Sequence, residues 1–471
     1  MRRHRPMPDR ARPRAALTSY SRMQSASAEV RRPRDVAALT GIFEEARRQG
    51  RRVVLRGAGL SFDGQSVDDD LAVSLEHFDA LSVDAAGARF TAGPGVTWGA
   101  VYRAINPAGL YVPAAVTTAS ATVGGTLAAN SLSRFSPVFG KEGRAIASLD
   151  VLTPDGALRT VSRTQEPDVF RAVVGGWGGV GAVVSATYEA RRAPPGACVR
   201  STCERDEGFD GLARALHPTG DGRTAYAVIS VDGARVRTLV LRAEVVEAGP
   251  LRPMLPHRPA HPSRVPIEWA VNRWHRASTL FWAFTHAVYM RGADRVPFVD
   301  GLYDFTFFMD GHLRAAQAAR RLGVPFGVAQ QTVVIPRGDD LGAFLREATS
   351  KLTAAGLEPS LVDVLWLPAD EPFDLSSTRD GAGYACTFSF EGPFDPGALR
   401  RALAALAVDA EAVGGRVHLV KNVCAPGDAI ERTYAPGLAR YAAVKRRVDP
   451  TNTLQSGFLR RCFPSVFGGA R

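Results

Sequence analysis

The sequence predicts an α+β fold, and three observations support it. Residues 53–61 run from a short apolar strand into a glycine turn, and residues 121–126 form a second glycine turn. Residues 302–424 alternate between strand-like and helix-like patterns, as expected for an antiparallel sheet with helices on one face. The chain has 471 residues, 45% hydrophobic and 22% charged, which is enough for two or three globular domains.

The amino-terminal elements follow from hydrophobic spacing and turn residues. Apolar residues three and four apart predict a helix over 34–49, and Val53, Val54 and Leu55 predict a buried strand. A helix is expected to begin after the turn at 93–97 and to extend through Ala104. The remaining elements are short strands at 71–75, 81–83 and 88–93, a hairpin over 147–160, a third glycine cluster at 175–181 and a strand at 182–187.

The first glycine turn has the composition of an anion-binding loop. Gly57 and Gly59 allow backbone conformations and close contacts that a side chain would forbid. Consecutive backbone N–H groups in such a turn can form a nest for a phosphate. Most strand-to-turn glycines bind nothing, so the interpretation depends on the second turn at 121–126.

The carboxyl-terminal half begins at a composition break over residues 191–195. Residues 196–245 suggest strands and a helix, and residues 246–266 suggest a loop. The aromatic residues of 269–289 fit either core packing or the wall of an apolar substrate pocket. The expected strands are 305–309, 330–336, 386–390 and 415–421, and the expected helices are 312–322, 341–355 and 396–413.

Charge and cysteine content exclude several classes of protein. The formal net charge is +11, and the first 14 residues alone hold six Arg and one Asp, so the rest carries no nucleic-acid footprint. No apolar run reaches the roughly 18–20 residues that a transmembrane helix needs. The five cysteines form no CxxC pair, which predicts neither a disulfide framework nor a metal site and favours a reducing cytoplasm.

The two glycine turns resemble the PCMH-type FAD-binding domain of the vanillyl-alcohol-oxidase superfamily. Within it the chain is most similar to the decaprenylphosphoryl-ribose oxidase family, through residues 330–336, 414–421, 440–450 and 459–461. The resemblance covers roughly residues 18–463. It implies a two-lobed FAD-binding domain (18–193), a substrate-binding domain (194–430) and a carboxyl-terminal segment (431–471) that returns to the FAD domain. The charge and proline content of residues 1–17 predict a disordered basic tail.

The resemblance also implies the site residues. The expected FAD contacts are Arg56, Gly57, Ala58, Gly59, Leu60, Ser61, Gln65, Ser66, Thr117, Thr118, Thr122, Gly124, Gly125, Asn130, Ser131, Ser133, Val183 and His418. The expected substrate contacts are Gln331, Trp366, Cys386 and Lys421. Many relatives link FAD covalently to a histidine where this chain has Leu60, so the expected FAD is non-covalent. Residues 131–137 contain no histidine, and Trp366 stands where the family has a lysine.

Two residues are candidates for catalysis. Lys421 could stabilise a reduced flavin, orient the substrate hydroxyl or act as a base if burial lowers its pKa. Taken without the resemblance, it is a solvent-facing strand lysine. His418 could be the base instead, or a packing residue. Cys386 fits an apolar wall better than a nucleophile, because buried thiols are usually inert.

The function that follows is an FAD-dependent oxidoreductase. It would oxidise a hydroxyl of a sugar or sugar-like substrate to a carbonyl, as the first half of an epimerisation that a reductase partner completes. One alternative is an oxidase of an alditol or an aglycone alcohol. An alternative of another class is a binding protein that keeps the fold without flavin. The electron acceptor stays open.

Overall fold

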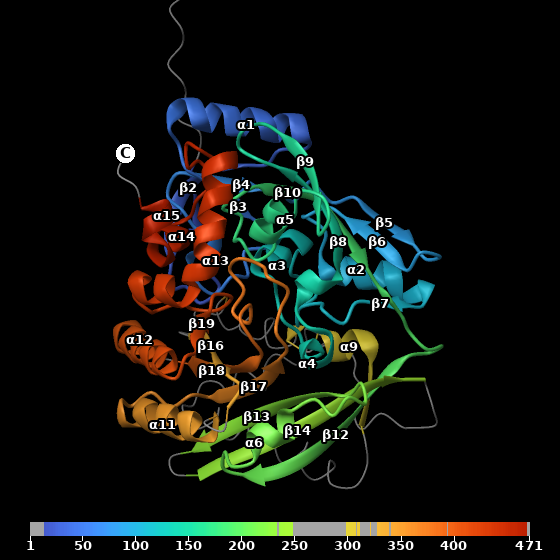
Figure 1. The fold of residues 1–471 in the computed structure, drawn as a ribbon, viewed down its shortest axis with the longest axis vertical. Coiled ribbons are helices and arrows are strands. Elements are labelled where there is room, and N and C mark those ends of the chain that lie inside the picture. The colour runs from blue at the N-terminus through green and yellow to red at the C-terminus, as the bar shows by residue number, and fades with distance from the viewer. Residues whose placement is uncertain are drawn as a thin grey trace, which may run out of the picture.

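The computed structural model describes residues 14–232, 235–247, 298–307, 309–310, 321, 327–338, 341–392 and 394–468. Within these residues the protein is α+β (Figure 1). Two smaller sheets lie in the amino-terminal part and one large antiparallel sheet lies in the carboxyl-terminal part. Nearly all of the loop expected at 246–266, the aromatic segment at 269–289 and the helix expected at 312–322 fall outside the described residues.

The first sheet has the strand order β1-β2-β4-β3: Arg14–Thr18, Ser25–Arg31, Leu71–Ser74 and Val53–Arg56. Strands β2, β4 and β3 are parallel, so helix α1 (Val36–Gln49) crosses over between β2 and β3. Asp35 caps α1, and Leu39 and Phe43 pack on the sheet. Strand β1 pairs with β2, which corrects the prediction that residues 14–17 belong to a disordered tail.

The second sheet is antiparallel, in the order β5-β6-β10-β8-β9: Leu81–Asp84, Arg89–Ala92, Ala182–Glu189, Ile146–Leu152 and Leu158–Ser162. Its core is aromatic, because Phe90 stacks on Tyr188 at 5.0 Å and Trp98 meets Tyr188 edge-on at 5.6 Å. The associated elements are α2 (Trp98–Ile105), β7 (Leu110–Tyr111), α3 (Val123–Ala129), α4 (Ser136–Phe139), α5 (Pro167–Val173) and β11 (Arg191–Arg192). The predicted helix after Gly93 and the predicted hairpin are confirmed.

The large sheet is antiparallel throughout its described strands. Their order is β15 (Phe298–Gly301), β12 (Cys198–Glu207), β14 (Arg235–Val246), β13 (Thr224–Asp232), β17 (Leu361–Leu367), β18 (Gly383–Gly392), β16 (Gly327–Pro336) and β19 (Arg416–His418). Helices α6 (Leu212–Leu216), α11 (Leu341–Ala354) and α12 (Pro396–Ala412) cover one face, and α4 packs on the other (Figure 1).

Two predictions for this region are wrong. Residues 302–306 form helix α9 (Leu302–Thr306), where a strand was expected at 305–309. Leu302, Phe305 and Thr306 are buried at the i, i+3, i+4 spacing of one helix face. The strand expected at 415–421 ends at His418 and gives way to a turn, so Lys421 lies in a turn rather than in a strand.

The carboxyl-terminal helices pack on the amino-terminal part. These are α13 (Gly427–Val448), α14 (Gly457–Cys462) and α15 (Pro464–Phe467). The Lys445 ammonium donates to the carbonyl of Gly179 at 2.8 Å, and the Tyr441 hydroxyl donates to that of Gly176 at 2.8 Å. Both acceptors belong to the third glycine cluster, so α13 supports that cluster from behind.

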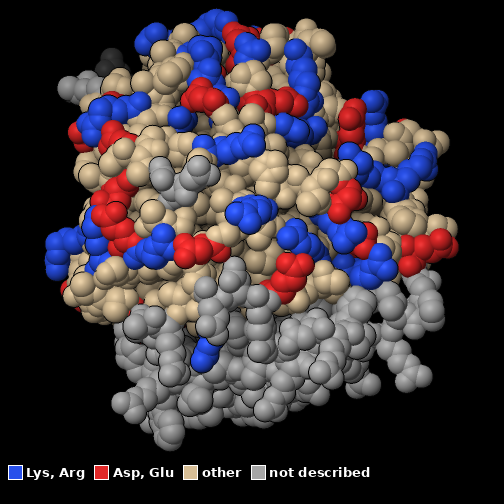
Figure 2. Space-filling model, turned by 60° about the horizontal axis from the view of Figure 1, so that its bottom comes forward, with Lys and Arg blue, Asp and Glu red and all other residues tan. Residues whose placement is uncertain are grey.

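The surface in Figure 2 carries basic and acidic side chains interspersed over its described part. Many form exposed ion pairs, such as Arg432 with Glu411 at 2.9 Å, and such pairs contribute little to stability. Among the described helices, none combines the length and the apolar character that a membrane span requires.

Candidate cofactor and substrate site

A cavity of about 330 Å³ lies where the glycine turns face the large sheet. Its wall comes from the turn after β3, the loops around α3, the third glycine cluster, strands β16, β17 and β18, and the turn after β19. Seventeen predicted site residues line it: Arg56, Gly57, Ala58, Gly59, Leu60, Ser61, Gln65, Ser66, Thr117, Thr118, Thr122, Gly124, Gly125, Ser131, Ser133, Val183 and Lys421.

The first two glycine turns lie directly against each other. A Cβ atom on Gly57 would overlap the hydroxyl of Thr122, and a Cβ on Gly124 would lie 2.5 Å from Cβ of Pro94. Gly59 has a φ of +72°, a conformation that disfavours other residues. The glycines therefore bring two backbone segments together at one end of the cavity.

Three polar atoms in the cavity wall are buried without a hydrogen-bond partner among the described residues. They are Oγ1 of Thr122, Nε1 of Trp177 and Oε1 of Gln330. An unsatisfied buried polar atom costs about 1–3 kcal/mol, so such atoms usually meet a ligand or water. This wall of glycine backbone and unpaired donors and acceptors fits a dinucleotide such as FAD.

The polar side chains of the first turn hold one another. Arg56 donates to the carbonyl of Ser66 at 3.0 Å, and the hydroxyls of Ser61 and Ser66 are 3.1 Å apart. Burial lowers the pKa of Arg56 from its ordinary value, but an arginine remains a cation. The turn therefore presents a fixed positive charge beside its backbone N–H groups.

Some predicted FAD contacts use their side chains elsewhere. Ser131 donates to the carbonyl of Thr126 at 3.1 Å, and Ser133 donates to that of Pro113 at 2.5 Å. Asn130 does not line the cavity. Its amide nitrogen donates to the Asp370 carboxylate at 2.7 Å, and its amide oxygen accepts from the N–H of Gly143 at 2.8 Å.

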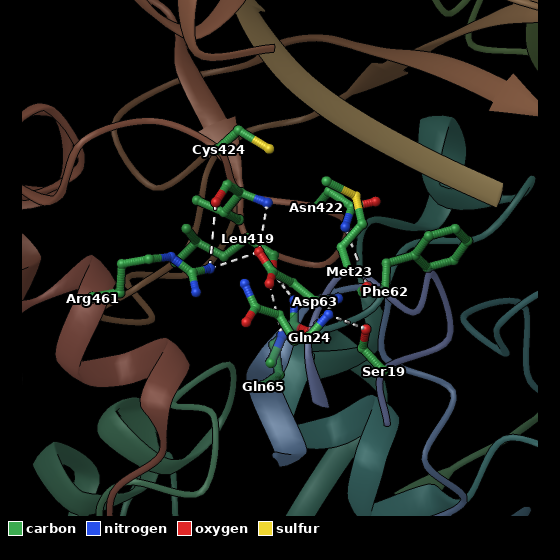
Figure 3. Close-up of polar contacts among 12 residues, drawn as sticks. Ser19, Met23, Gln24, Phe62, Asp63, Gln65, Leu419, Asn422, Cys424 and Arg461 are labelled. Atoms are coloured by element: carbon green, nitrogen blue, oxygen red, sulfur yellow. Dashed lines mark hydrogen bonds and ion pairs between the residues drawn. The ribbon is translucent and has the colours of Figure 1, made fainter. Parts of the chain in front are cut away.

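The predicted FAD contact Gln65 joins the first glycine turn to the turn of Lys421 (Figure 3). Its amide nitrogen donates to the carbonyls of Leu419 and Lys421 at 2.9 and 3.0 Å, and its oxygen accepts from the N–H of Asp63 at 2.9 Å. The Asp63 carboxylate also accepts from Val423 and Arg461 at 2.9 and 2.6 Å. We call Asp63 and Gln65, together with these hydrogen bonds, the 63–65 clamp.

Three predicted substrate residues lie on the helix-covered face of the large sheet, away from the cavity. Gln331 donates to the carbonyl of Leu403 on α12, and Trp366 packs on His217 beyond α6. Cys386 is fully buried opposite Val364, and burial raises the pKa of its thiol. Side chains alternate between faces along a strand, so an error of one residue moves each to the helix-covered side.

The neighbouring residues face the cavity instead. Gln330, Asp363 and Thr387 line it, and Asp363 pairs with Thr387 across β17 and β18. The apolar strand 361–367 contains one acid, which was a visible signal in the sequence. Burial raises the pKa of Asp363 to about 6, although the positive charges of Arg134 and Lys421 act to lower it.

Lys421 lines the cavity from the turn after β19. Its ammonium lies 4.2 Å from the centroid of the Phe62 ring, within cation–π distance. Burial lowers its pKa to about 8, whereas the nearby charge of Asp363 acts to raise it.

His418 does not line the cavity, although it lies opposite Thr332 on β16. Its Nδ1 is 3.0 Å from the hydroxyl of Ser377, and its Nε2 is buried with no partner among the described residues. Burial and the positive charges of Lys141 and Lys421 hold its pKa well below the usual range, so the imidazole is neutral.

Comparisons with known proteins find one family model and several relatives that each match part of the chain. Residues 27–162 match the family model described as FAD binding domain. The chain is 32% identical over 130 residues to the FAD-linked oxidoreductase fogF of Aspergillus ruber, covering 28% of this chain and 26% of that protein. It is 30% identical over 157 residues to decaprenylphosphoryl-beta-D-ribose oxidase of Mycolicibacterium smegmatis, covering 33% and 34%.

A third relative is the uncharacterized oxidoreductase ORF5 in the fasciation locus of Rhodococcoides fascians, 30% identical over 156 residues. That match covers 33% of this chain and 35% of the relative. The matches thus span only about a third or less of these relatives.

We expect Gly57→Ala to weaken FAD binding about 10- to 100-fold, because the added methyl group would push the two glycine turns apart, an overpacking cost of about 1–3 kcal/mol. Fluorescence titration of the apoprotein with FAD measures the dissociation constant. Gly41→Ala is the matched control, since nothing lies within 4 Å of a Cβ there. Equal affinities for the two variants would contradict the role of this turn.

Proposed function

We propose that this chain, which carries a PCMH-type FAD-binding domain, is an FAD-dependent oxidoreductase that oxidises a hydroxyl of a sugar or sugar-like substrate to a carbonyl. The observation that carries the proposal is one continuous cavity. It runs from the glycine turns to Lys421 and to the face of the large sheet opposite helices α6, α11 and α12. A named relative that oxidises decaprenylphosphoryl-beta-D-ribose adds support for a sugar substrate.

In the proposal, residues at different positions along the cavity have different roles. When bound, FAD supplies the oxidising chemistry by accepting a hydride. In this proposal the glycine turns and Arg56 hold the pyrophosphate. Lys421 binds and orients the reacting hydroxyl, and Gln330 and Thr387 hydrogen-bond the neighbouring hydroxyls of a polyhydroxylated ring. The 63–65 clamp fixes the backbone of Lys421.

Flavin bleaching tests the proposal. The FAD-loaded protein is mixed without oxygen with D-ribose, methyl β-D-ribofuranoside, xylitol and kanamycin, and the flavin absorbance is followed. We expect a glycoside or a free sugar to bleach the flavin fastest. Faster bleaching by xylitol would favour an alditol oxidase. A colourless protein that takes up no FAD would favour a flavin-free binding protein.

We expect the bound FAD to be non-covalent. The cavity wall contains Leu60 but neither histidine nor cysteine among the described residues, so it offers no such side chain for a flavin linkage. Acid precipitation of the yellow protein should leave the colour in the supernatant. A yellow pellet after washing in denaturant would contradict this expectation.

A further inference from the structure

We propose that Asp363 accepts the proton of the substrate hydroxyl, with Lys421 as its positively charged partner. This inference rests on the proposed function and names the base for that reaction. Asp363 is neither a residue implied by the resemblance nor part of residues 27–162, which the family model matches.

Three charged side chains from three elements line the same part of the cavity. Asp363 comes from the middle of β17, Arg134 from the loop before α4, and Lys421 from the turn after β19. The pairing of Asp363 with Thr387 and Val228 directs its carboxylate to the cavity side of the sheet. The Arg134 guanidinium lies 4.8 Å from the Tyr226 ring, and the Lys421 ammonium lies 4.2 Å from the Phe62 ring.

The other titratable candidates fit the role of base less well. His418 does not line the cavity. Lys421 is a base only when neutral, and the charge of Asp363 favours its protonated form. Burial raises the pKa of Asp363 to about 6, and the charges of Arg134 and Lys421, opposed by Glu391, act to keep its carboxylate ionised. Between about pH 6 and about pH 8 the pair is therefore a carboxylate beside an ammonium.

The proposed step balances with FAD as the oxidant. The hydroxyl O–H bond breaks, and its proton moves to the Asp363 carboxylate. The electron pair left on oxygen forms the carbonyl double bond as the hydride leaves carbon with its two electrons for FAD. The Lys421 ammonium stabilises the negative charge that develops on oxygen. The carboxylic acid then returns its proton to solvent.

The test compares Asp363→Asn, Asp363→Glu and the wild type by stopped-flow reduction of bound FAD. The substrate is whichever of the four test compounds bleaches the flavin fastest, and the pH runs from about 5 to about 9. The wild-type rate should rise with pH through about 6, as Asp363 ionises, and fall through about 8, as Lys421 loses its proton. Asp363→Asn should be about 100-fold slower and lack the rise near pH 6. Its fall should move to lower pH, because Lys421 has lost its counter-charge.

The experiment has a matched control and two outcomes that would contradict the proposal. Asp409→Asn makes the same chemical change at a residue that pairs with Lys351 outside the cavity, and it should retain the wild-type profile. Asp363→Glu should restore the rise. An unchanged rise in Asp363→Asn would overturn the proposal, and a wild-type rate that climbs through pH 8 would assign the base to Lys421.

A second readout does not depend on the substrate. Sulfite adds to oxidised flavin and leaves a negative charge on it, so a nearby carboxylate weakens the adduct. At one fixed pH, Asp363→Asn should bind sulfite more tightly than the wild type and Asp409→Asn equally. Equal affinity in all three would place Asp363 away from the reacting ring and overturn the proposal. Absence of bleaching by every panel compound would instead count against the proposed function.

Discussion

Replacing Lys421 by alanine is expected to leave FAD bound and to slow flavin reduction by substrate about 1,000-fold. The glycine turns proposed to hold the cofactor offer backbone N–H groups and Arg56 rather than the Lys421 side chain. The ammonium is the donor proposed to hold the reacting hydroxyl and to stabilise its developing negative charge. Its removal also takes away one of the two positive charges, Arg134 and Lys421, that favour the ionised form of Asp363.

Stopped-flow reduction and FAD titration separate the two effects. Lys421→Arg keeps the charge but changes its geometry and should recover part of the rate. Lys351→Ala is the matched control, because that ammonium is 51% exposed and pairs with Glu347 and Asp409 at the surface. An unchanged reduction rate in Lys421→Ala would remove the residue from the mechanism, and loss of FAD would show a role in cofactor binding.

Lys445→Ala is expected to lower the free energy of unfolding by about 3–5 kcal/mol, because it leaves a buried carboxylate unpaired. The Lys445 ammonium is almost fully buried, lies 2.5 Å from the Asp449 carboxylate and donates to the carbonyls of Gly179 and Leu454. The Asp449 carboxylate also accepts from the N–H groups of Thr453 and Leu454.

Urea unfolding of the apoprotein measures this loss. Lys351→Ala again provides the control, since exposed ion pairs such as those of Lys351 contribute at most about 1 kcal/mol to the free energy of unfolding. FAD affinity should fall as well, because Gly179 follows Trp177 and Gly178 in the cavity wall. A stability within about 1 kcal/mol of the wild type would mean that water or repacking replaces the ammonium.

The sequence was sufficient for several helices and for the glycine turns, but not for helix α9 or for the end of strand β19. Hydrophobic spacing predicted α1, α11 and α12, and the glycines at 57–59 and 124–125 line the cavity as expected. The sheet face that lines the cavity was missed because the resemblance matched residue types such as Gln331 and Cys386. Strands buried on both faces give a nearly continuous apolar run, so their sequence does not reveal which residues alternate toward the cavity.

Contacts between distant segments could not be predicted either. The Gln65 side chain bonds backbone carbonyls 354 and 356 positions later, and no local pattern indicates such a pairing. Nothing in the sequence around Trp177 indicates that this residue lines the cavity, because buried indoles most often pack in the core. Its unpartnered Nε1 in the cavity wall becomes visible only once the third glycine cluster is folded.

The 63–65 clamp has a thermodynamic consequence. It makes the backbone around Lys421 part of the same hydrogen-bonded unit as the turn beside the cofactor end of the cavity. A ligand that orders either segment lowers the entropy that the other must lose on binding. We therefore expect the affinities at the two ends of the cavity to be reciprocally linked, so that each occupant tightens the binding of the other by the same factor.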